Sequence, residues 1–237
     1  MTRPHVVLLH AFPLDCRMWA DVKPALERAG YLVAAPDLPG PPADSTLAGW
    51  SERILDTVEG PLIPVGASMG GYVAWELWLQ ARERIPALAL VGSRASGETE
   101  PSRAARDEQL ALLDESGVPG VWARLEEALF APAAGRDVVA RAREIALEQG
   151  TERVAAALVA LRDRADRSAM LADARVPALV VVGEEDAIVP DAEAEALARS
   201  LPDARLVRVP GAGHLVALER PEETARALLA FLAEVTG

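Results

Sequence analysis

The stretch that decides the fold is Gly66-Ala67-Ser68-Met69-Gly70, a G-x-S-x-G pattern. It follows an apolar run, 62–65, that predicts a buried strand, and it precedes a segment with helical spacing, 69–81. A strand that turns at once into a helix strains the residue at the turn and leaves no room for side chains two positions away. Glycines at 66 and 70 remove those clashes. The pattern therefore predicts a strand–turn–helix unit with Ser68 raised above the carboxyl ends of the strands.

Strands and helices alternate on both sides of this unit. The predicted strands are apolar throughout, which is typical of parallel strands with both faces of the sheet covered. The fold class is therefore α/β, a mostly parallel sheet flanked by helices. Strands are predicted at 5–10, 31–35, 62–65, 87–91, 178–182 and 205–209, and helices at 19–29, 47–58, 69–81, 191–200 and 221–235.

The middle of the chain has a different pattern. From 94 to 170 the apolar positions recur at helical spacing only, which predicts about four helices. We expect this segment to be an inserted helical cap, or lid, and residues 1–93 and 171–237 to form the core domain. Two of its predicted helices, 102–116 and 121–130, can close over Ser68.

Composition excludes several classes of function. The 237 residues are 51% hydrophobic, enough for a folded core, and 36 acidic against 24 basic residues give a net charge of −12. That charge repels nucleic acid and anionic membranes, so we expect neither as a partner. No apolar run reaches the length of a membrane helix and the first residues do not read as a secretion signal, so a cytoplasmic location is expected. The oligomeric state is not readable from the sequence.

Cysteine and histidine are scarce. Cys16 is the single cysteine and cannot form an internal disulfide, and three histidines offer few ways to build a metal site. We expect no metal and no cofactor. The glycine-rich turn around Ser68 could also bind phosphate, but the G-x-G-x-x-G dinucleotide pattern and its later acidic residue are absent.

A serine becomes a good nucleophile when a neutral imidazole takes its proton. His5 and His10 bound the first predicted strand, whereas His214 lies in the glycine-rich loop 211–214 after the last one. We therefore predict His214 as the base. Because histidine ordinarily titrates near pH ~6.5, activity should fall in mild acid.

A carboxylate must hold this imidazole in one tautomer. Glu184, Glu185 and Asp186 all follow the strand 178–182, at the edge of the sheet where such sites lie. Asp186 is favoured among the three because it stands just before the apolar segment that re-enters the fold.

An oxyanion hole needs two N–H donors. The backbone of Met69, directly after Ser68, supplies one. The loop 10–13 after the first strand is the natural source of the second, and we choose Phe12, since Pro13 has no N–H.

The chain resembles the α/β-hydrolase superfamily over nearly its whole length. Five segments match in order: HAFPLD (10–15), PDLPG (36–40), GASMGG (66–71), GEEDAIVP (183–190) and GAGHLVALERPEE (211–223). Within it the sequence looks like the small serine esterases, enol-lactonases and cofactor-free haloperoxidase-like enzymes. The resemblance implies Ser68, Asp186 and His214 as the triad, and Phe12 and Met69 as the oxyanion hole. The sequence departs from the family at Ala11, where glycine is usual, and in PDLPGPPADS, which lacks the usual glycine spacing.

The resemblance implies a serine hydrolase that cleaves small to medium acyl or aryl esters, with lactones as a further class, through an acyl-enzyme. Its expected partner is a small-molecule ester, and the acidic net charge favours neutral esters unless a local arginine reverses it. Arg94 is a candidate to bind an acidic substrate. A C–C bond hydrolase, a lyase, a perhydrolase or a weakly catalytic ligand receptor stay open as alternatives. The predicted substrate-binding residues are Trp122, Phe130, Ile188, Val189 and Leu215.

Overall fold

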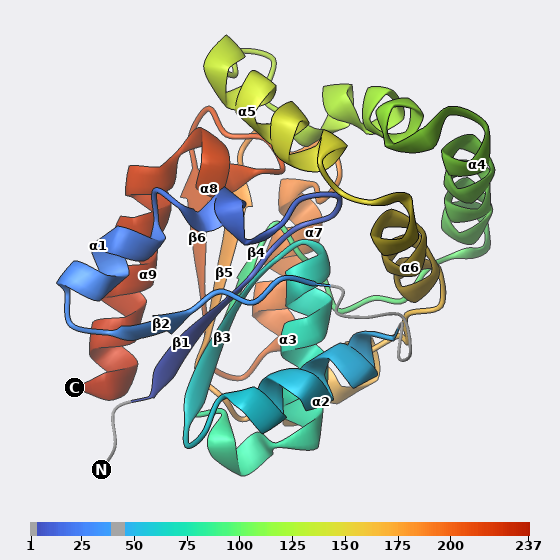
Figure 1. The fold of residues 1–237 in the computed structure, drawn as a ribbon. Helices are drawn as coiled ribbons and strands as arrows, with labels where there is room; N and C mark the ends of the chain where they lie inside the picture. The colour runs from blue at the N-terminus through green and yellow to red at the C-terminus, as the bar shows by residue number, and fades with distance from the viewer. Residues whose placement is uncertain (1–3, 39–45) are drawn as a thin grey trace.

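A parallel sheet forms the centre of the molecule (Figure 1). The structure is a computed structural model that describes residues 4–38 and 46–237. In these residues six strands pair in the order β2-β1-β3-β4-β5-β6, all of them parallel. The strands are β1 (His5–Leu9), β2 (Leu32–Ala34), β3 (Leu62–Ala67), β4 (Leu88–Val91), β5 (Ala178–Gly183) and β6 (Ala204–Val209).

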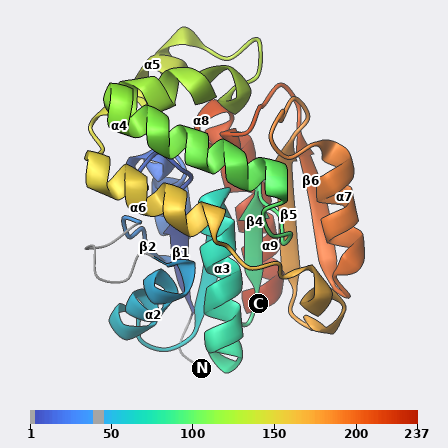
Figure 2. The ribbon, with the colours of Figure 1, turned by 90° about the vertical axis from the view of Figure 1, so that its right-hand side faces the viewer.

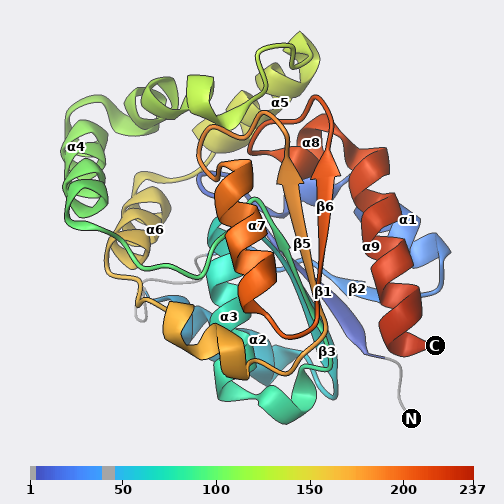
Figure 3. The same ribbon diagram turned by 180° about the vertical axis from the view of Figure 1, so that it is seen from behind.

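Helices cover both faces of the sheet (Figures 1, 2 and 3). Helices α1 and α9 lie on one face, and α2, α3 and α7 lie on the other. The predicted helices over 47–58, 69–81, 191–200 and 221–235 are confirmed to within one residue at each end. The bounds of these helices are α1 (Lys23–Arg28), α2 (Leu47–Thr57), α3 (Met69–Gln80), α7 (Asp191–Ser200) and α9 (Pro221–Thr236).

Each face of the sheet has its own apolar cluster. Alternate residues of a strand point to opposite faces, so Val7 belongs to the same apolar cluster as Trp75 of α3, whereas the neighbouring Val6 belongs to the cluster that contains Phe231 of α9. Strands β3, β4 and β5 are buried along their whole length. The prediction of parallel strands covered on both faces is therefore confirmed, and burial of this apolar surface is the main source of stability.

Helices without strands fill the segment between β4 and β5. Figures 1 and 2 show α4, α5 and α6 above the edge where the strands end. Helix α4 is divided by a kink at Gly117, whose φ of 66° is not helical, so the two predicted helices 102–116 and 121–130 form its two halves. The bounds are α4 (Glu100–Leu129), α5 (Arg136–Leu147), α6 (Thr151–Arg162) and the 3₁₀ turn η4 (Ser168–Asp173).

One prediction about local structure was wrong, and two short elements were not predicted. The single helix expected over 19–29 is split into the 3₁₀ turn η1 (Cys16–Trp19) and the short α1. The ring of Pro24 would collide with the carbonyl of Ala20 in one continuous helix, so α1 starts with Pro24 in its first turn. The sequence reading also missed the 3₁₀ turn η3 (Arg82–Arg84) and the helix α8 (Val216–Glu219), both too short for a periodic signal.

The last two residues of PDLPG (36–40) and the residues from Pro39 onward in PDLPGPPADS (36–45) lie outside the described residues. Within residues 4–38 and 46–237, no helix combines the length and the apolar character that crossing a bilayer requires.

Candidate active site

Ser68 stands at the turn between β3 and α3, with φ 47° and ψ −110°. Among the described residues it is the one residue other than glycine with a positive φ. A Cβ atom on Gly66 would lie 2.3 Å from the carbonyl oxygen of Gly70, and one on Gly70 would lie 2.2 Å from that of Leu9. The expected reason for both glycines is therefore confirmed: a side chain at either position would collide with backbone.

The neighbouring strand holds the turn in place. The Ser68 N–H donates to the Val91 carbonyl at the end of β4 (2.9 Å), and the Ser93 hydroxyl donates to the Ser68 carbonyl (2.9 Å). The Ser68 residue itself is half-buried. With the Gly71 N–H, which also donates to the Ser68 carbonyl (2.9 Å), three hydrogen bonds fix this backbone, and none of them uses the Ser68 hydroxyl.

His214 and Asp186 form a buried pair. The His214 Nδ1 atom lies 2.9 Å from Asp186 Oδ2 and 3.1 Å from Oδ1. The Asp186 Oδ1 atom also accepts hydrogen bonds from the N–H groups of Ile188 and Val189, both at 2.8 Å. The loop after β5 therefore fixes the carboxylate, and the carboxylate fixes the imidazole. Glu184 and Glu185 are exposed.

Gly92 connects this pair with the serine turn. It directly follows Val91, which binds the Ser68 backbone, and a Cβ on Gly92 would lie 3.0 Å from the His214 carbonyl and 3.3 Å from Asp186 Oδ2. The segments after β3, β5 and β6 thus bring Ser68, Asp186 and His214 to one edge of the sheet, and Gly92 leaves room between them.

His10 has a different function from His214. The His10 imidazole is buried; its Nε2 atom accepts the Leu38 N–H at 2.6 Å, and its Nδ1 atom lies 3.0 Å from the Ala11 carbonyl. Burial lowers the pKa of His10 below the usual value of 6.5. This neutral ring joins the loop after β1 to the loop after β2.

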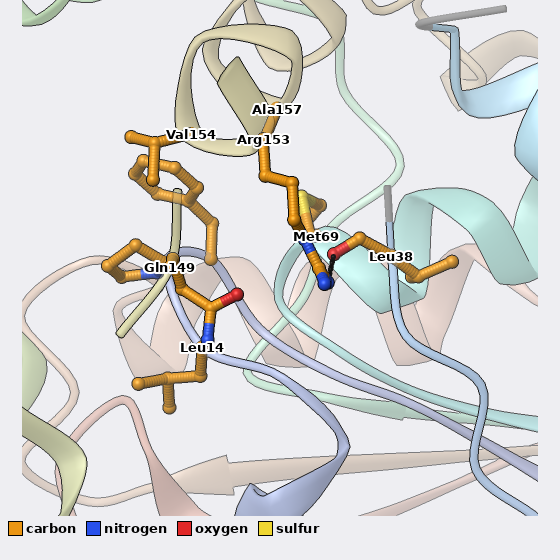
Figure 4. Close-up of a pocket in the computed structure, with 9 residues that line it drawn as sticks. Leu14, Leu38, Met69, Gln149, Arg153, Val154 and Ala157 are labelled. Atoms are coloured by element: carbon orange, nitrogen blue, oxygen red, sulfur yellow. Dashed lines mark hydrogen bonds between the residues drawn. The ribbon is translucent and has the colours of Figure 1, made fainter. Parts of the chain in front are cut away.

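The two residues with the predicted oxyanion donors, Phe12 and Met69, both line a narrow pocket. Among the described residues, neither the Phe12 N–H nor the Met69 N–H donates to another group. The loop at Phe12 is a tight turn closed by Leu14 N–H to the Ala11 carbonyl (2.9 Å), and its Phe12–Pro13 peptide is cis. The space open to water is about 10 Å³, which is about one water molecule. Figure 4 shows the lining residues: Phe12, Pro13, Leu14, Leu38, Met69, Gln149, Arg153, Val154 and Ala157.

The five predicted substrate-binding residues do not line this pocket. Trp122 and Phe130 pack edge to face, with ring centroids 6.2 Å apart, in the same apolar cluster as Leu215. Ile188 and Val189 contribute backbone N–H groups to Asp186. Their contact with substrate stays a prediction.

The structure places Arg153, and not the predicted candidate Arg94, in the pocket lined by Phe12 and Met69. The Arg94 guanidinium pairs with Glu193 (3.3 Å) and donates to the Ile188 carbonyl, outside the pocket between Phe12 and Met69. Arg153 on α6 lies inside that pocket. No sequence signal distinguishes Arg153 from the other arginines of the 94–170 segment, because helical spacing does not show which side chain reaches the sheet.

One cluster of side chains has the composition of a metal site. One ligand atom from each of Asp15, Cys16 and Asp37 lies within 4.8 Å of the others. Asp15 already pairs with Arg17, and Asp37 accepts the Cys16 N–H. Burial raises the pKa of the Cys16 thiol to about 11, so the thiol keeps its proton at neutral pH and is a poor metal ligand.

The chain belongs to the alpha/beta hydrolase fold family, whose model matches residues 4–221. It is similar to a pimeloyl-[acyl-carrier protein] methyl ester esterase of Aromatoleum aromaticum, with 34% identity over 95% of this chain and 96% of that protein. A protein described by the same words from Nitrosomonas europaea is 29% identical over 93% of this chain and 92% of its own length.

The fold is also similar to solved structures. A thermophilic esterase from Thermogutta terrifontis, solved with malate bound, superposes with a TM-score of 0.93 at 30% identity, covering 100% of this chain and 92% of that one. A hydrolase from Pseudomonas aeruginosa gives a TM-score of 0.86, also at 30% identity, covering 97% of this chain and 90% of that one. These matches confirm the predicted superfamily and the prediction of a carboxylesterase-type enzyme.

Proposed function

We propose that the protein hydrolyses carboxylic esters through an acyl-enzyme on Ser68. The observation that supports this most is the buried hydrogen bond of 2.9 Å from His214 Nδ1 to Asp186, beside a serine held at φ 47°. When Nδ1 carries the proton shared with Asp186, Nε2 of His214 is left as an acceptor. A fixed imidazole with a free basic nitrogen is what a serine needs to lose its proton.

Acylation follows from these positions. Ser68 Oγ attacks the ester carbonyl while His214 Nε2 takes the hydroxyl proton, and Asp186 stabilises the imidazolium that forms. The carbonyl oxygen becomes negative and accepts hydrogen bonds from Phe12 N–H and Met69 N–H, the two donors without partners among the described residues. The imidazolium then gives its proton to the leaving alcohol.

Deacylation repeats the cycle with water. His214 removes a proton from a water molecule, which attacks the acyl-serine, and the same two N–H groups receive the oxyanion. The bond from the acyl carbon to Ser68 Oγ then breaks, the imidazolium returns its proton to Oγ, and the carboxylic acid leaves. Among the described residues the imidazole makes its side-chain hydrogen bonds only with Asp186, so the bond from Ser68 Oγ to Nε2 forms when substrate is in place.

The segment 94–170 acts in this proposal as a lid over the site. Val154 and Ala157 of α6 lie on one wall of the narrow pocket, so a shift of α6 would widen it. The descriptions of the relatives make methyl esters of acyl chains the first substrates to test. A cytoplasmic location remains part of the proposal.

The test is a panel of methyl and p-nitrophenyl esters of increasing acyl length, with lactones included, on wild type and Ser68→Ala. The variant should lose at least about a thousandfold in kcat, because no other group can form the acyl-enzyme. It should keep the unfolding midpoint of the wild type. Substantial turnover by this variant would contradict the assignment, and a wild type inert on the whole panel would favour a ligand receptor.

Asp186→Asn provides a matched second variant. Its remaining oxygen can still accept the N–H groups of Ile188 and Val189, which keeps the loop closed, while its amide group faces His214 Nδ1 and favours the wrong tautomer. We expect kcat to fall on the order of a thousandfold or more with little change in stability.

A further inference from the structure

Arg153 is the charged member of the pocket between Phe12 and Met69. Of the nine residues that line this pocket it alone carries a charge, and most of the others are apolar. Figure 4 shows its side chain reaching from α6 toward Met69 and Leu38. A guanidinium stays charged at every pH of interest, so this pocket is electropositive next to the proposed oxyanion hole.

The hydrogen bonds of this guanidinium are incomplete. Nη2 donates to the Leu38 carbonyl at 3.2 Å, but the buried Nε has no hydrogen-bond partner. Among the described residues no carboxylate pairs with Arg153. A buried donor without an acceptor is unfavourable, and more so when it is charged. The position is therefore unfavourable for the free protein alone.

Three other arginines near the site differ from Arg153 because each forms an ion pair with a carboxylate of the protein. Arg94 has Glu193 as its partner, Arg164 has Glu98, and Arg167 has Glu76. Arg94 Nε also lacks a hydrogen bond, but it lies 3.3 Å from the Glu193 carboxylate, which balances its charge. Arg153 is left without such a carboxylate, in a pocket where substrate must come close.

No other pocket side chain can replace Arg153 as an anion donor. Gln149 uses its amide Nε2 on Asp15 Oδ2 and on the Ile145 carbonyl, both at 2.8 Å. The nearby His10 is neutral and already engaged with Leu38 and Ala11. An anionic group in this pocket would therefore be bound by Arg153.

We propose that Arg153 binds a carboxylate carried by the ester substrate, so that the preferred substrates are monoesters of short dicarboxylic acids. This inference rests on the proposed function, since it is Phe12 and Met69 that place the ester carbonyl at the same pocket. A carboxylate is flat and accepts two parallel N–H bonds from a guanidinium, whereas a phosphate is bulkier than the narrow pocket favours. The preference for neutral esters expected from the net charge is thereby reversed locally.

The experiment compares charged and neutral esters of matched length. Monomethyl succinate is compared with methyl butyrate, monomethyl glutarate with methyl valerate, and monomethyl adipate with methyl hexanoate. For each pair the ratio of kcat/KM for the monoester to kcat/KM for the neutral ester is measured in wild type, Arg153→Met, Arg153→Lys and Arg143→Met. Arg143 is exposed on α5 and provides the control for loss of one positive charge.

The ratio should fall on the order of tenfold to a hundredfold in Arg153→Met, mainly through KM of the monoester, because a charge-assisted hydrogen bond is lost. Arg153→Lys should restore part of it, and Arg143→Met should keep the wild-type ratio. If Arg153→Met changes both kinds of ester by the same factor, or changes neither, the inference is overturned.

Binding separates this inference from the proposed function. Calorimetry of glutarate with Ser68→Ala, and with Ser68→Ala combined with Arg153→Met, measures the carboxylate site without turnover. Glutarate binding that disappears with Arg153 supports the site even if the wild type cleaves no ester, a result that would refute the proposed hydrolysis alone. Equal glutarate binding by both variants refutes the carboxylate site.

Discussion

Ser68 occupies a backbone conformation that few side chains adopt, and the residues around it explain why it can. The chemical need for small residues at 66 and 70 is visible in the sequence, because G-x-S-x-G lies between a strand and a helix. The contacts of Gly92 and Ser93 with this site are not visible, because they come from the neighbouring strand. Backbone strain at Ser68 is thus held by contacts that only the folded sheet provides.

Asp186 could be predicted from the sequence as a site residue, whereas Arg153 could not. Asp186 could be chosen over its two acidic neighbours because an apolar segment follows it, and the structure buries it while exposing them. Arg153 could not be predicted as a binding residue, because the proposal for it rests on the missing carboxylate partner of its guanidinium. That Arg153 has no carboxylate partner can be seen only in the structure, where the positions of the surrounding described residues are known.

His10 should make the stability of the protein depend on pH. Its pKa is lowered in the folded state by burial, against the opposing effects of Asp37 and Asp15 and with a smaller lowering from Arg153. In the unfolded chain it titrates near its usual 6.5, so the unfolded state binds more protons below that pH. The free energy of unfolding should therefore fall as pH decreases from about 6.5 to 5, by at most about 1.4 kcal/mol per pH unit from this group.

Urea unfolding at several pH values between about 5 and 7 measures this effect. His10→Gln removes the titrating group and should flatten the curve in that window. His5→Gln, at the other end of β1, is the matched control and should leave most of the slope. An unchanged slope in His10→Gln would show that other groups cause the acid sensitivity.

Among the α-helices of the described residues, α8 is the shortest and is not predicted from the sequence, yet it connects the segment 94–170 with the histidine loop. Its last residue, Glu219, accepts the N–H groups of Ala131 and Gly213, both at 2.9 Å. The Leu129 carbonyl at the end of α4 accepts the N–H groups of His214 and Leu215, both at 3.1 Å. A four-residue helix has no periodicity to read, so a contact between α4 and the His214 loop could not be predicted.

Glu219→Gln should loosen this connection. Burial raises the pKa of the Glu219 carboxyl above its usual 4.5, although two backbone donors oppose the rise. Glutamine can accept at one oxygen only, so one buried N–H, of Ala131 or of Gly213, loses its acceptor. The free energy of unfolding should fall by roughly 1–3 kcal/mol, and kcat should fall because His214 is less well held.

Chemical unfolding and ester kinetics check this prediction together. Glu222→Gln, exposed at the start of α9, makes the same chemical change on the surface and should alter neither quantity appreciably. Equal behaviour of the two variants would mean that Glu219 does not support the histidine loop.

At the scale of the whole molecule, the order of elements was largely readable from the sequence. Apolar strands alternating with amphipathic helices predicted a covered parallel sheet, and the long helical segment 94–170 was recognised by its change of pattern. The spatial order of the strands and the position of α6 against Met69 follow from tertiary packing and were not readable. The separation of the chain into a core and a lid remains a prediction.

The chain enters and leaves the helical segment at one place, where a cluster of charged residues holds it. The Arg167 N–H donates to the Ala95 carbonyl (2.8 Å), and Glu98 pairs with Arg164 and with Arg106. The Arg164 guanidinium also lies over the Tyr72 ring of α3, 4.4 Å from its centre. The side chains of Glu98 and Arg164 are 4% and 5% exposed, so this pair is buried.

Glu98→Gln should therefore destabilise the whole protein. It leaves two arginines without their carboxylate, and breaking a buried pair costs about 3–5 kcal/mol. Thermal unfolding should show a lowered midpoint, and limited proteolysis should cut faster within 94–170. Glu195→Gln, which breaks an exposed pair with Arg199 on α7, should leave both measurements nearly unchanged, and a similar response from the two variants would contradict the role of Glu98.

The closeness of the two crossings has an evolutionary consequence. A Cβ on Gly97 would lie 3.0 Å from the backbone nitrogen of Asp166, so the outgoing and returning chains touch. We expect insertions, deletions or a transplanted segment between these two points to leave the pairing of β4 with β5 untouched. Since the proposed function makes the intervening helices a lid over the site, exchanging them should alter substrate preference in descendants of this gene while the sheet is inherited.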